Sequence, residues 1–381
     1  MHDAGVRDRT LTQSANADPD EGDPALIERI RREISASPDE HITFARFMEM
    51  ALTEPGLGYY ATSDARPTRD GDFLTAPELH PFFGRCIGRL LSDVWTRLGS
   101  PDRFVVQEWG AGRGTLRRTT LDGLAADDSS LARAIDWQAV DLPGRHPDVD
   151  EAPFVGVVIA NEYLDALPVH RLVSRRDRIL ERYVTWLDGR FTEVDGELSD
   201  ATLVAPLDAA RLRLADGQLA EVRPAAEAWL RLVATRLTHG MVLVIDYGHQ
   251  AQELYGPLRM AGSLVTYRDH VAGDDPFAAV GRQDLTAHVD ISALERVAEA
   301  LGLDRLGSTT QAWMLVGLGL GELLYQLGHD QATDPADYLD ARASVGRLLD
   351  PRHLGGFRVL GFGRGISAGS PIVALQARPG P

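Results

Sequence analysis

The start of the chain alternates between apolar and polar positions with the period of an amphipathic helix. In "PALIERIRREIS", which begins at Pro24, and in "ITFARFMEMAL", which begins at Ile42, apolar residues fall three and four positions apart. Asp23 is expected to cap the first of these helices, and Pro24 suits its first helical position. Residues 1–23 are polar and acidic without such a period, so we expect a disordered tail there.

Farther along, short runs rich in β-branched and aromatic residues predict strands. These runs are "RFVVQEW", "AIDWQAV", "FVGVVIAN" and "MVLVIDYG". Segments that fit helices or connections separate them, which is typical of a parallel sheet with both faces covered. We therefore expect an α/β fold.

Two segments before the fourth run predict antiparallel hairpins inserted into this fold. "VHRLVSRRDRILERYVTWLDGRFTEV" and "DAARLRLADGQLAEVRP" alternate in character, and each contains an Asp-Gly turn signal. The tail "FRVLGFGRGISAGSPIVALQARP" predicts a closing hairpin. Upstream, "TEPGLGYYATSDARPTRDGDFLTAPELH" is rich in Gly, Pro and Asp, which predicts a long functional loop.

The composition of the chain limits the classes of partner that it can bind. A chain of 381 residues with 44% hydrophobic residues can bury a large core, and a net charge of −17 would repel nucleic-acid phosphates and anionic membrane surfaces. We expect neither partner. The lone Cys86 excludes an intramolecular disulfide and, with no apolar signal run at the start, predicts a reducing cytoplasm. Glu322 interrupts the longest apolar stretch, so no membrane span is expected.

A glycine-rich turn follows the first predicted strand in "VVQEWGAGRGTL". Thr115 occupies the position where a dinucleotide fingerprint would have its third glycine, so the spacing is instead an acid followed by three alternating glycines. Glu108 offers an acceptor for an ammonium group, and Asp141 ends the next strand where such folds hold a ribose. This pairing predicts an S-adenosylmethionine site; a purely structural turn is the open alternative.

A second polar cluster follows the third predicted strand in "VVIANEYLDALPVH". Asn161, Glu162 and Asp165 would emerge at the carboxyl edge of the sheet, where open α/β sheets bind ligands. Carboxylates fit an arginine guanidinium bidentately, so Glu162 with Asp165 would orient a nitrogen that is to be methylated. The alternative is that Asn161 and Asp165 cap the following helix.

Several motifs in collinear order resemble one known family. They are "GYY", "GDFLTAPELHPFFG", "EWGAGRGTL", "NEYLDALPVH", "LVIDYG", "GSLVTYRDH" and "GRQDLTAHVD". Together they resemble the MidA-like family of class I S-adenosylmethionine-dependent methyltransferases over roughly residues 40–320. The family's mitochondrial members are complex I assembly factors that methylate a protein arginine. This chain departs from the family pattern at Ala111, where proline is usual, and after Asp141, where "LPGRHPDVDEA" replaces a polar stretch.

The resemblance implies a role for each matching position. The implied positions for S-adenosylmethionine are Glu108, Gly110, Gly112, Gly114, Asp141, Gly71, Asp72, Thr75 and Glu78. The implied catalytic positions are Asn161, Glu162, Asp165 and His288. Asp246, Tyr247 and Asp290 would lie beside them. No second histidine pairs obviously with His288, so a metal is not expected. For Tyr59 and Tyr60, packing and substrate contact both stay open, whereas Trp109 and Tyr163 are expected in the core.

The expected architecture is a Rossmann-like class I methyltransferase sheet with N-terminal helices and an inserted β-rich and helical substrate region. The expected division is an acidic tail (1–23), a helical region with a lid loop (24–100), the first part of the core (101–175), inserted hairpins (176–223), the rest of the core (224–310) and C-terminal helices with the closing hairpin (311–381).

Three functions fit these expectations. The first is a protein-arginine methyltransferase acting on a subunit of respiratory complex I or another cytoplasmic subunit. The second is a small-molecule methyltransferase of the same fold, and the third is a noncatalytic assembly partner. Acids at both predicted pockets, Glu108 and Glu162, favour an enzyme, because a scaffold needs neither. The sequence leaves the oligomeric state open, a homodimer included.

Overall fold

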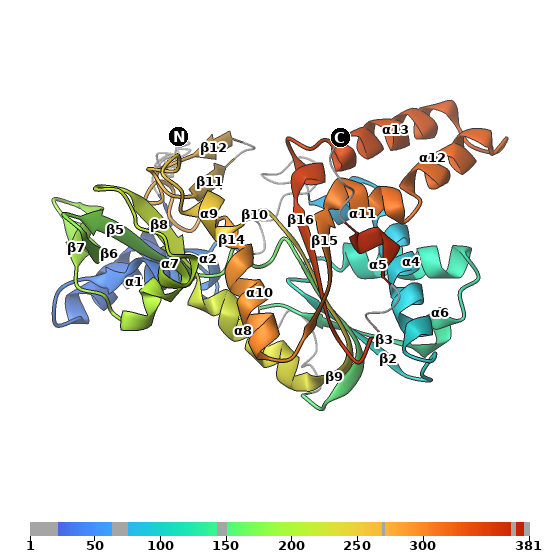
Figure 1. Cartoon of the computed structure of the whole chain (residues 1–381). Coiled ribbons are helices and arrows are strands. Elements are labelled where there is room, and N and C mark those ends of the chain that lie inside the picture. The colour runs from blue at the N-terminus through green and yellow to red at the C-terminus, as the bar shows by residue number, and fades with distance from the viewer. Residues whose placement is uncertain (1–21, 63–74, 143–150, 269–270, 367–370, 377–381) are drawn as a thin grey trace, which may run out of the picture.

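The computed structural model describes residues 22–62, 75–142, 151–268, 271–366 and 371–376. These residues form two lobes (Figure 1). One contains a six-stranded sheet between helices, and the other contains a smaller antiparallel sheet with the first helices of the chain. Residues 1–21 of the expected tail and residues 63–74 of the expected lid loop lie outside the described residues.

The larger lobe is built on a mixed sheet in the order β15-β16-β9-β4-β2-β3. Its strands are β2 (Phe104–Trp109), β3 (Ile135–Val140), β4 (Phe154–Asn161), β9 (Leu237–Asp246), β15 (Asp304–Thr310) and β16 (Arg358–Arg364). Strands β3, β2, β4 and β9 run parallel, whereas β16 is antiparallel to both β9 and β15. All four predicted strands are present, so the α/β prediction is confirmed.

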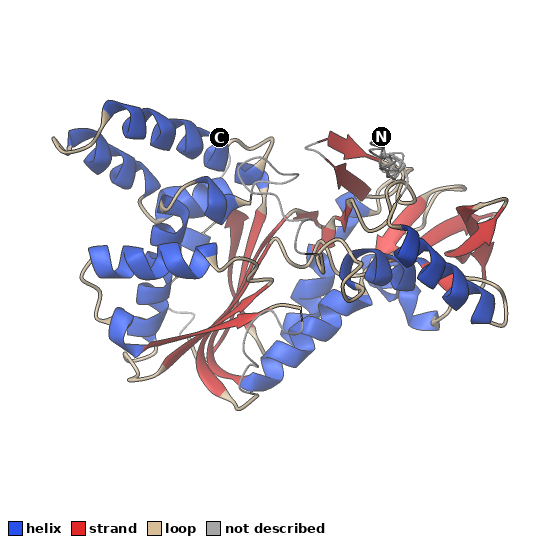
Figure 2. Ribbon diagram, turned by 180° about the vertical axis from the view of Figure 1, so that it is seen from behind, coloured by secondary structure: helices blue, strands red, loops and turns tan. Residues whose placement is uncertain are grey.

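Helices cover both faces of this sheet, as Figure 2 shows. Neighbouring strand residues alternate between the faces: Val106 and Ile159 belong to one apolar cluster, and Val105 and Val158 belong to the other. The first face packs against α4 (Phe82–Arg97), α5 (Thr115–Ala126), α11 (Gln311–Gly317), α12 (Leu320–His329) and α13 (Pro335–Leu349). The second face packs against α8 (Pro224–Arg236) and α10 (Ile291–Ala300).

The smaller lobe is an antiparallel sheet with helices α1 (Pro24–Ala36) and α2 (Phe44–Thr53) against it. Its strands are β1 (Ile42–Thr43), β5 (His170–Arg175), β6 (Arg178–Leu187), β7 (Arg190–Gly196) and β8 (Leu219–Val222). Both predicted helices are confirmed, and Asp23 Oδ1 caps the first by accepting from the backbone N–H groups of Ala25 and Leu26 at 2.9 and 3.1 Å.

Short elements complete the described chain. They are α3 (Ala76–Leu79), α6 (Leu131–Ala134), η1 (Ala201–Val204), α7 (Ala205–Ala210), β10 (Gly248–His249), α9 (Ala251–Leu254), β11 (Leu264–Arg268), β12 (Val271–Gly273), β13 (Asp284–Ala287), β14 (Val289–Asp290), η2 (Leu354–Gly356) and η3 (Val373–Leu375). Strands β12, β11 and β13 form a small antiparallel sheet, and β10 pairs in parallel with β14.

Two hairpin predictions differ from the structure. The start of "DAARLRLADGQLAEVRP" lies in helix α7, because "APLDAA" combines good helix formers with Pro206 in the first turn; only its end forms a strand, β8. At the C-terminus, the described residues after 357 contribute one strand, β16, which inserts between β9 and β15 instead of folding back as a hairpin.

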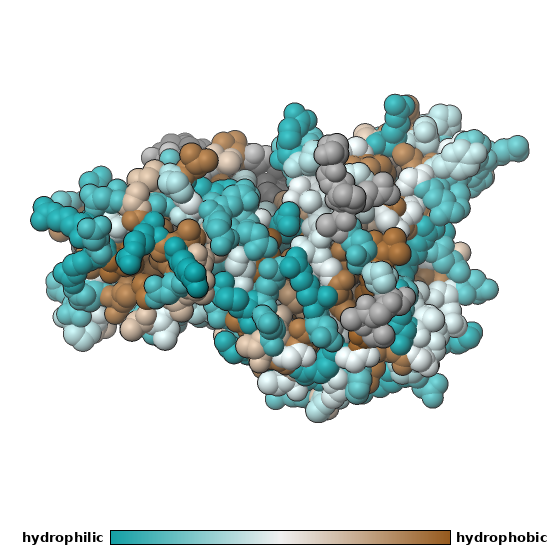
Figure 3. Space-filling view, viewed as in Figure 1, coloured by the Kyte–Doolittle hydropathy of each residue, from teal (hydrophilic) through white to brown (hydrophobic). Residues whose placement is uncertain are grey.

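The visible surface is mostly hydrophilic, with apolar side chains scattered over both lobes (Figure 3). In the described part of the chain, no helix combines the length and the apolar character needed to cross a bilayer.

Candidate active site

A pocket lies at the carboxyl ends of β2, β4 and β9, where the larger lobe meets the smaller one. It contains about 1050 Å³ of empty space, part of which is open to solvent. Its lining residues are Tyr59, Tyr60, Thr75, Pro77, Glu78, Glu108, Trp109, Gly110, Ala111, Gly112, Arg113, Thr115, Leu116, Asn161, Glu162, Asp165, Tyr247 and Asp284. Both polar clusters expected from the sequence therefore border one cavity.

The glycine turn after β2 forms one wall of the pocket. Gly110, Gly112 and Gly114 have φ values of 72°, 56° and 70°, in the left-handed region that only glycine adopts readily. A Cβ on Gly110 would lie 2.9 Å from the Tyr163 ring. The Gly112 N–H donates to Asp141 Oδ2 at 2.7 Å, so the acid at the end of β3 holds the turn in place. The wall thus exposes backbone to a ligand at close range.

Glu108, at the end of β2, is nearly buried beside this turn. Its Oε2 accepts from the indole Nε1 of Trp137 at 2.8 Å. Burial raises the pKa of Glu108 to about 7, against the opposing effect of the Trp137 hydrogen bond. A buried carboxylate of this kind favours a cationic ligand group, because an ammonium would offset the cost of keeping it charged. Together with the glycine cradle, Glu108 fits a ligand with an amino-acid end.

Glu162 lies on a second wall of the pocket, formed by Asn161 at the end of β4 and by Glu162 and Asp165 after it. Its backbone has φ 51°, a strained conformation for a residue with a side chain, and its N–H donates to the Ile245 carbonyl at 2.9 Å. Oε1 accepts from the N–H of Ala76 and from Asn161 Nδ2, each at 3.0 Å, whereas buried Oε2 has no partner among the residues described. Burial raises the pKa of Glu162 to about 8.

Asp165 continues this wall. Burial raises the pKa of its carboxyl, while the hydroxyl of Tyr247 donates to it and opposes that rise. Asp246 Oδ2 accepts from the N–H groups of Leu164 and Asp165 at 2.9 and 3.2 Å and so fixes the turn that carries Asp165. Within the described part of the chain, Asp165 Oδ1 and Asn161 Oδ1 are also buried without a hydrogen-bond partner.

Tyr60 and Asp284 complete the pocket, although Asp284 was not among the residues expected there from the sequence. The Tyr60 hydroxyl donates to Asp284 Oδ1 at 2.7 Å across 224 positions of sequence. Asp284 stands in the motif "GRQDLTAHVD", where an acid at the start of an apolar strand was the available signal. Tyr59 also lines the pocket, and both tyrosines pack in the apolar cluster of the smaller lobe, so this pair combines packing with a place at the cavity.

The other expected residues lie at varying distances from the pocket. Thr75 and Glu78 line it, whereas Gly71 and Asp72 lie outside the described residues. His288 is behind Tyr247, with ring centroids 5.3 Å apart, and stacks on His249 at 5.0 Å. Burial lowers the pKa of His288 to about 4, so its imidazole is neutral. It is not one of the lining residues.

Asp290 accepts from the Ala293 N–H at 2.9 Å and caps α10, the use of acids common at helix starts. Gly114 likewise serves at the start of α5, as its N-terminal capping residue. Trp109 and Tyr163 pack with Trp229, and Trp109 also reaches the pocket. Within the described ranges, no group of three or more His, Cys, Asp or Glu side chains is placed to hold a metal ion.

The chain is similar to known methyltransferases over most of its length. Residues 86–145 and 124–309 match the family described as "Putative S-adenosyl-L-methionine-dependent methyltransferase". A crystal structure of a COG1565 superfamily member from Burkholderia thailandensis, bound to S-adenosyl-homocysteine, superposes with a TM-score of 0.78 at 31% identity, covering 92% of this chain and 94% of that one.

Curated relatives are more distant. The mitochondrial protein arginine methyltransferase NDUFAF7 homolog of Drosophila melanogaster is 26% identical over 84% of this chain and 84% of its own length. The mitochondrial protein arginine methyltransferase NDUFAF7 of Homo sapiens is 26% identical over 82% of this chain and 78% of its own length.

Proposed function

This chain belongs to the family of S-adenosyl-L-methionine-dependent methyltransferases, and we propose that it transfers the methyl group to a guanidinium nitrogen of a protein arginine. The names of the Drosophila and human relatives, both protein arginine methyltransferases, support this choice of acceptor. The chemistry of the pocket wall formed by Asn161, Glu162 and Asp165 supports it independently.

One observation carries the proposal. Glu162 Oε2, Asp165 Oδ1 and Asn161 Oδ1 are buried acceptor atoms that lack a donor among the described residues. A buried acceptor without a donor is costly, so the wall favours a ligand rich in N–H groups. The guanidinium has five N–H donors, no acceptor and a permanent charge, which no other side chain combines. It would satisfy these oxygens and offset the buried negative charge.

The residues of the glycine wall fit S-adenosylmethionine. Glu108 would accept from the ammonium end, the backbone of Gly110 and Gly112 would lie against the ligand, and Asp141 would hold the turn. The bound molecule supplies a methyl group on a sulfonium, which is already activated for transfer. This leaves positioning and proton removal as the tasks of the protein.

The wall formed by Asn161, Glu162 and Asp165 performs both tasks in our proposal. Asp165 and Asn161 accept from the guanidinium N–H groups and turn one nitrogen toward the methyl carbon, an orientation effect worth up to about 7–11 kcal/mol. As the N–C bond forms, the C–S bond breaks and its electron pair stays on sulfur. The nitrogen then loses a proton, and Glu162 Oε2 accepts it. A pKa of about 8 at Glu162 suits a base of this kind near neutral pH.

The acceptor protein and the compartment belong to the same proposal. The resemblance to a family whose mitochondrial members serve complex I makes a subunit of respiratory complex I the first acceptor to test. The single, buried Cys86 supports a reducing cytoplasm as the site of the reaction.

The test uses lysate from cells of the source organism that lack the gene. The purified chain is added with S-adenosylmethionine labelled in the methyl group, and the protein fraction is hydrolysed to amino acids. We expect label in methylarginine, together with an arginine peptide that is methylated in the parent cells and unmethylated in the deletion. Label confined to small molecules would reject the protein acceptor, and label in another amino acid would reject arginine.

A further inference from the structure

Arg223 is a buried arginine at the junction of the two lobes. It directly follows strand β8 of the smaller sheet and directly precedes helix α8 of the larger lobe. Among the residues described, its guanidinium donates to backbone carbonyls only: Nε to Leu167 at 3.0 Å, Nη1 to His288 at 3.3 Å, and Nη2 to Asp165 and Ala287 at 2.8 and 2.7 Å. Four carbonyls on one guanidinium make a rigid planar clamp.

The clamped carbonyls come from two segments beside the proposed acceptor site. We call the pocket wall that these segments support, with Asn161, Glu162 and Asp165, the acceptor wall. Those of Asp165 and Leu167 belong to the turn after β4, and those of Ala287 and His288 belong to the chain that runs from β13 into β14. The Ala287 N–H also donates to the Asp165 carbonyl, at 3.1 Å. Arg223 therefore fixes the segment that carries Asp165 against the segment that carries Asp284.

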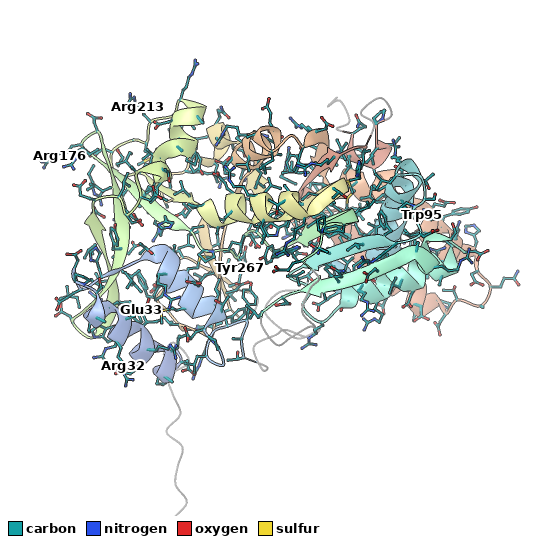
Figure 4. All side chains as sticks on the ribbon, turned by 90° about the horizontal axis from the view of Figure 1, so that it is seen from below. Arg32, Glu33, Trp95, Arg176, Arg213 and Tyr267 are labelled. Carbon is teal, nitrogen blue, oxygen red and sulfur yellow. The ribbon has the colours of Figure 1, made fainter. Side chains whose placement is uncertain are left out.

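Arg223 is also a positive charge beside buried acids. Its guanidinium opposes the rise that burial produces in the pKa of both Asp165 and Asp246. The titratable and charged groups that face Asp165 are Tyr60, Glu162, Arg223, Asp246, Tyr247 and Tyr267. Tyr267, on β11, is labelled in Figure 4 between the two lobes. Within this set Arg223 supplies the positive charge.

We propose that Arg223 is a positioning residue for methyl transfer, which sets the spacing between the segments of Asp165 and Asp284 before the acceptor arrives. The proposal rests on the proposed function in one respect, namely that the acceptor lies against this wall. Arg223 acts through the carboxylates and has no place among the residues that line the pocket.

Arg364 provides a matched control. It is partly buried and, within the part of the chain that the structure describes, donates to backbone carbonyls alone, from Nη1 to Ala234 and Leu237 at 2.7 and 3.0 Å and from Nη2 to Leu301 at 2.8 Å. These carbonyls lie at the amino-terminal edge of β9 and at the ends of α8 and α10, away from the pocket. Arg364→Met removes a clamp of the same kind and reports what the loss of such a clamp does to stability alone.

The experiment compares the full-length wild type with Arg223→Lys, Arg223→Met and Arg364→Met. Methyl transfer into deletion-strain lysate protein is measured from pH 5.5 to 9 per folded molecule, and S-adenosyl-homocysteine binding is measured by calorimetry. We expect Arg223→Met to lower kcat on the order of 100-fold. The acid limb of the pH–rate profile of Arg223→Met should move to higher pH, because Asp165 loses a neighbouring cation. Binding of S-adenosyl-homocysteine should stay within about twofold of wild type, since the clamp contacts the acceptor wall only.

Arg223→Lys separates geometry from charge and covers the case in which Arg223→Met does not fold. It keeps the cation but not the planar fork, so we expect a lower kcat with the acid limb near that of wild type. Hydrogen exchange at the Ala287 amide should be faster in Arg223→Lys than in wild type and unchanged in Arg364→Met. A wild-type kcat in Arg223→Lys, or an unchanged Ala287 exchange rate, would overturn the proposal.

This design distinguishes failure of the inference from failure of the proposed function. If the wild type transfers no methyl group to arginine, the proposed function fails. The exchange rate at Ala287 and the binding of S-adenosyl-homocysteine need no acceptor, so they still judge the clamp itself. If Arg223→Met matches Arg364→Met in kcat and in its acid limb, the role of Arg223 is structural only.

Discussion

The backbone N–H of Ala76 donates to Glu162 Oε1 over 3.0 Å, although 86 positions separate the two residues. Helix α3 thereby fixes one oxygen of the Glu162 carboxylate and leaves Oε2 without a partner at the pocket wall, among the residues described. The Ala76 N–H thus holds one oxygen of the carboxylate in place, and in our proposal an N–H group of the methyl acceptor satisfies the other.

Glu162→Gln should separate cofactor binding from catalysis. The substitution keeps the shape of the side chain and removes the proton acceptor, so we expect kcat to fall by roughly 100-fold. The affinity for S-adenosyl-homocysteine should stay near that of wild type, because Glu162 faces the acceptor. Initial rates and calorimetry measure the two effects, with the exposed Glu197→Gln as control. A parallel loss of affinity would place Glu162 at the cofactor instead.

The same substitution should change how stability depends on pH. The pKa of Glu162 is raised from 4.5 to about 8, so the folded protein retains a proton there that the unfolded chain releases. Between these values a rise of one pH unit destabilises the wild type by up to about 1.4 kcal/mol through this group. We expect Glu162→Gln to gain stability relative to wild type from pH 5 to pH 8. Thermal unfolding at both pH values measures it, and a constant difference would contradict the shift.

Gly112→Val should abolish cofactor binding. Its φ of 56° strains any side chain, and the added atoms would enter the space where backbone meets ligand. The control is Gly189→Val, at φ 81° outside the pocket, where an added Cβ would meet open space. Both variants should lose some stability, but only the first should lose S-adenosyl-homocysteine binding in calorimetry. Normal binding by folded Gly112→Val would reject the assigned role of the turn.

Trp137→Phe should make cofactor binding more sensitive to acid. The pKa of Glu108 is raised to about 7, so wild-type affinity for S-adenosyl-homocysteine should fall as the pH drops below about 7. The indole donor lowers the pKa of Glu108, so its removal should raise that pKa and make the affinity fall at a higher pH. Trp95→Phe is the control, since its indole donates to the Pro101 carbonyl and the residue, labelled in Figure 4, does not line the pocket. Identical pH profiles in both variants would contradict the role of Glu108.

Tyr60→Phe should weaken acceptor binding alone. It deletes the hydroxyl that donates to Asp284 and leaves the ring in place, so we expect the acceptor KM to rise about tenfold with kcat little changed. Tyr183→Phe removes a comparable hydrogen bond, to the Glu197 carbonyl, outside the pocket. Steady-state kinetics with the identified acceptor measure both. A wild-type KM in Tyr60→Phe would remove this pair from the acceptor site.

Residues close together in the chain were predictable from the sequence. The three glycines and Glu162 each follow a buried strand directly, so their place at the sheet edge follows from the strand pattern. The pairing of Tyr60 with Asp284 was not predictable, because it depends on how the smaller lobe folds back over residues far apart in the chain. Arg223 was missed for the same reason, since its role lies in the carbonyls it meets and not in a motif.

The two walls of the pocket also differ in how much of the chain must be synthesised before they can form. The wall with the three glycines lies within one segment, which runs from β2 through α5, α6 and β3 to Asp141. The acceptor wall joins Tyr60, Asp165 and Asp284, so it cannot assemble before the ribosome has released the whole of β13. A nascent chain that stops short of Asp284 therefore lacks part of the wall that would receive the proposed arginine.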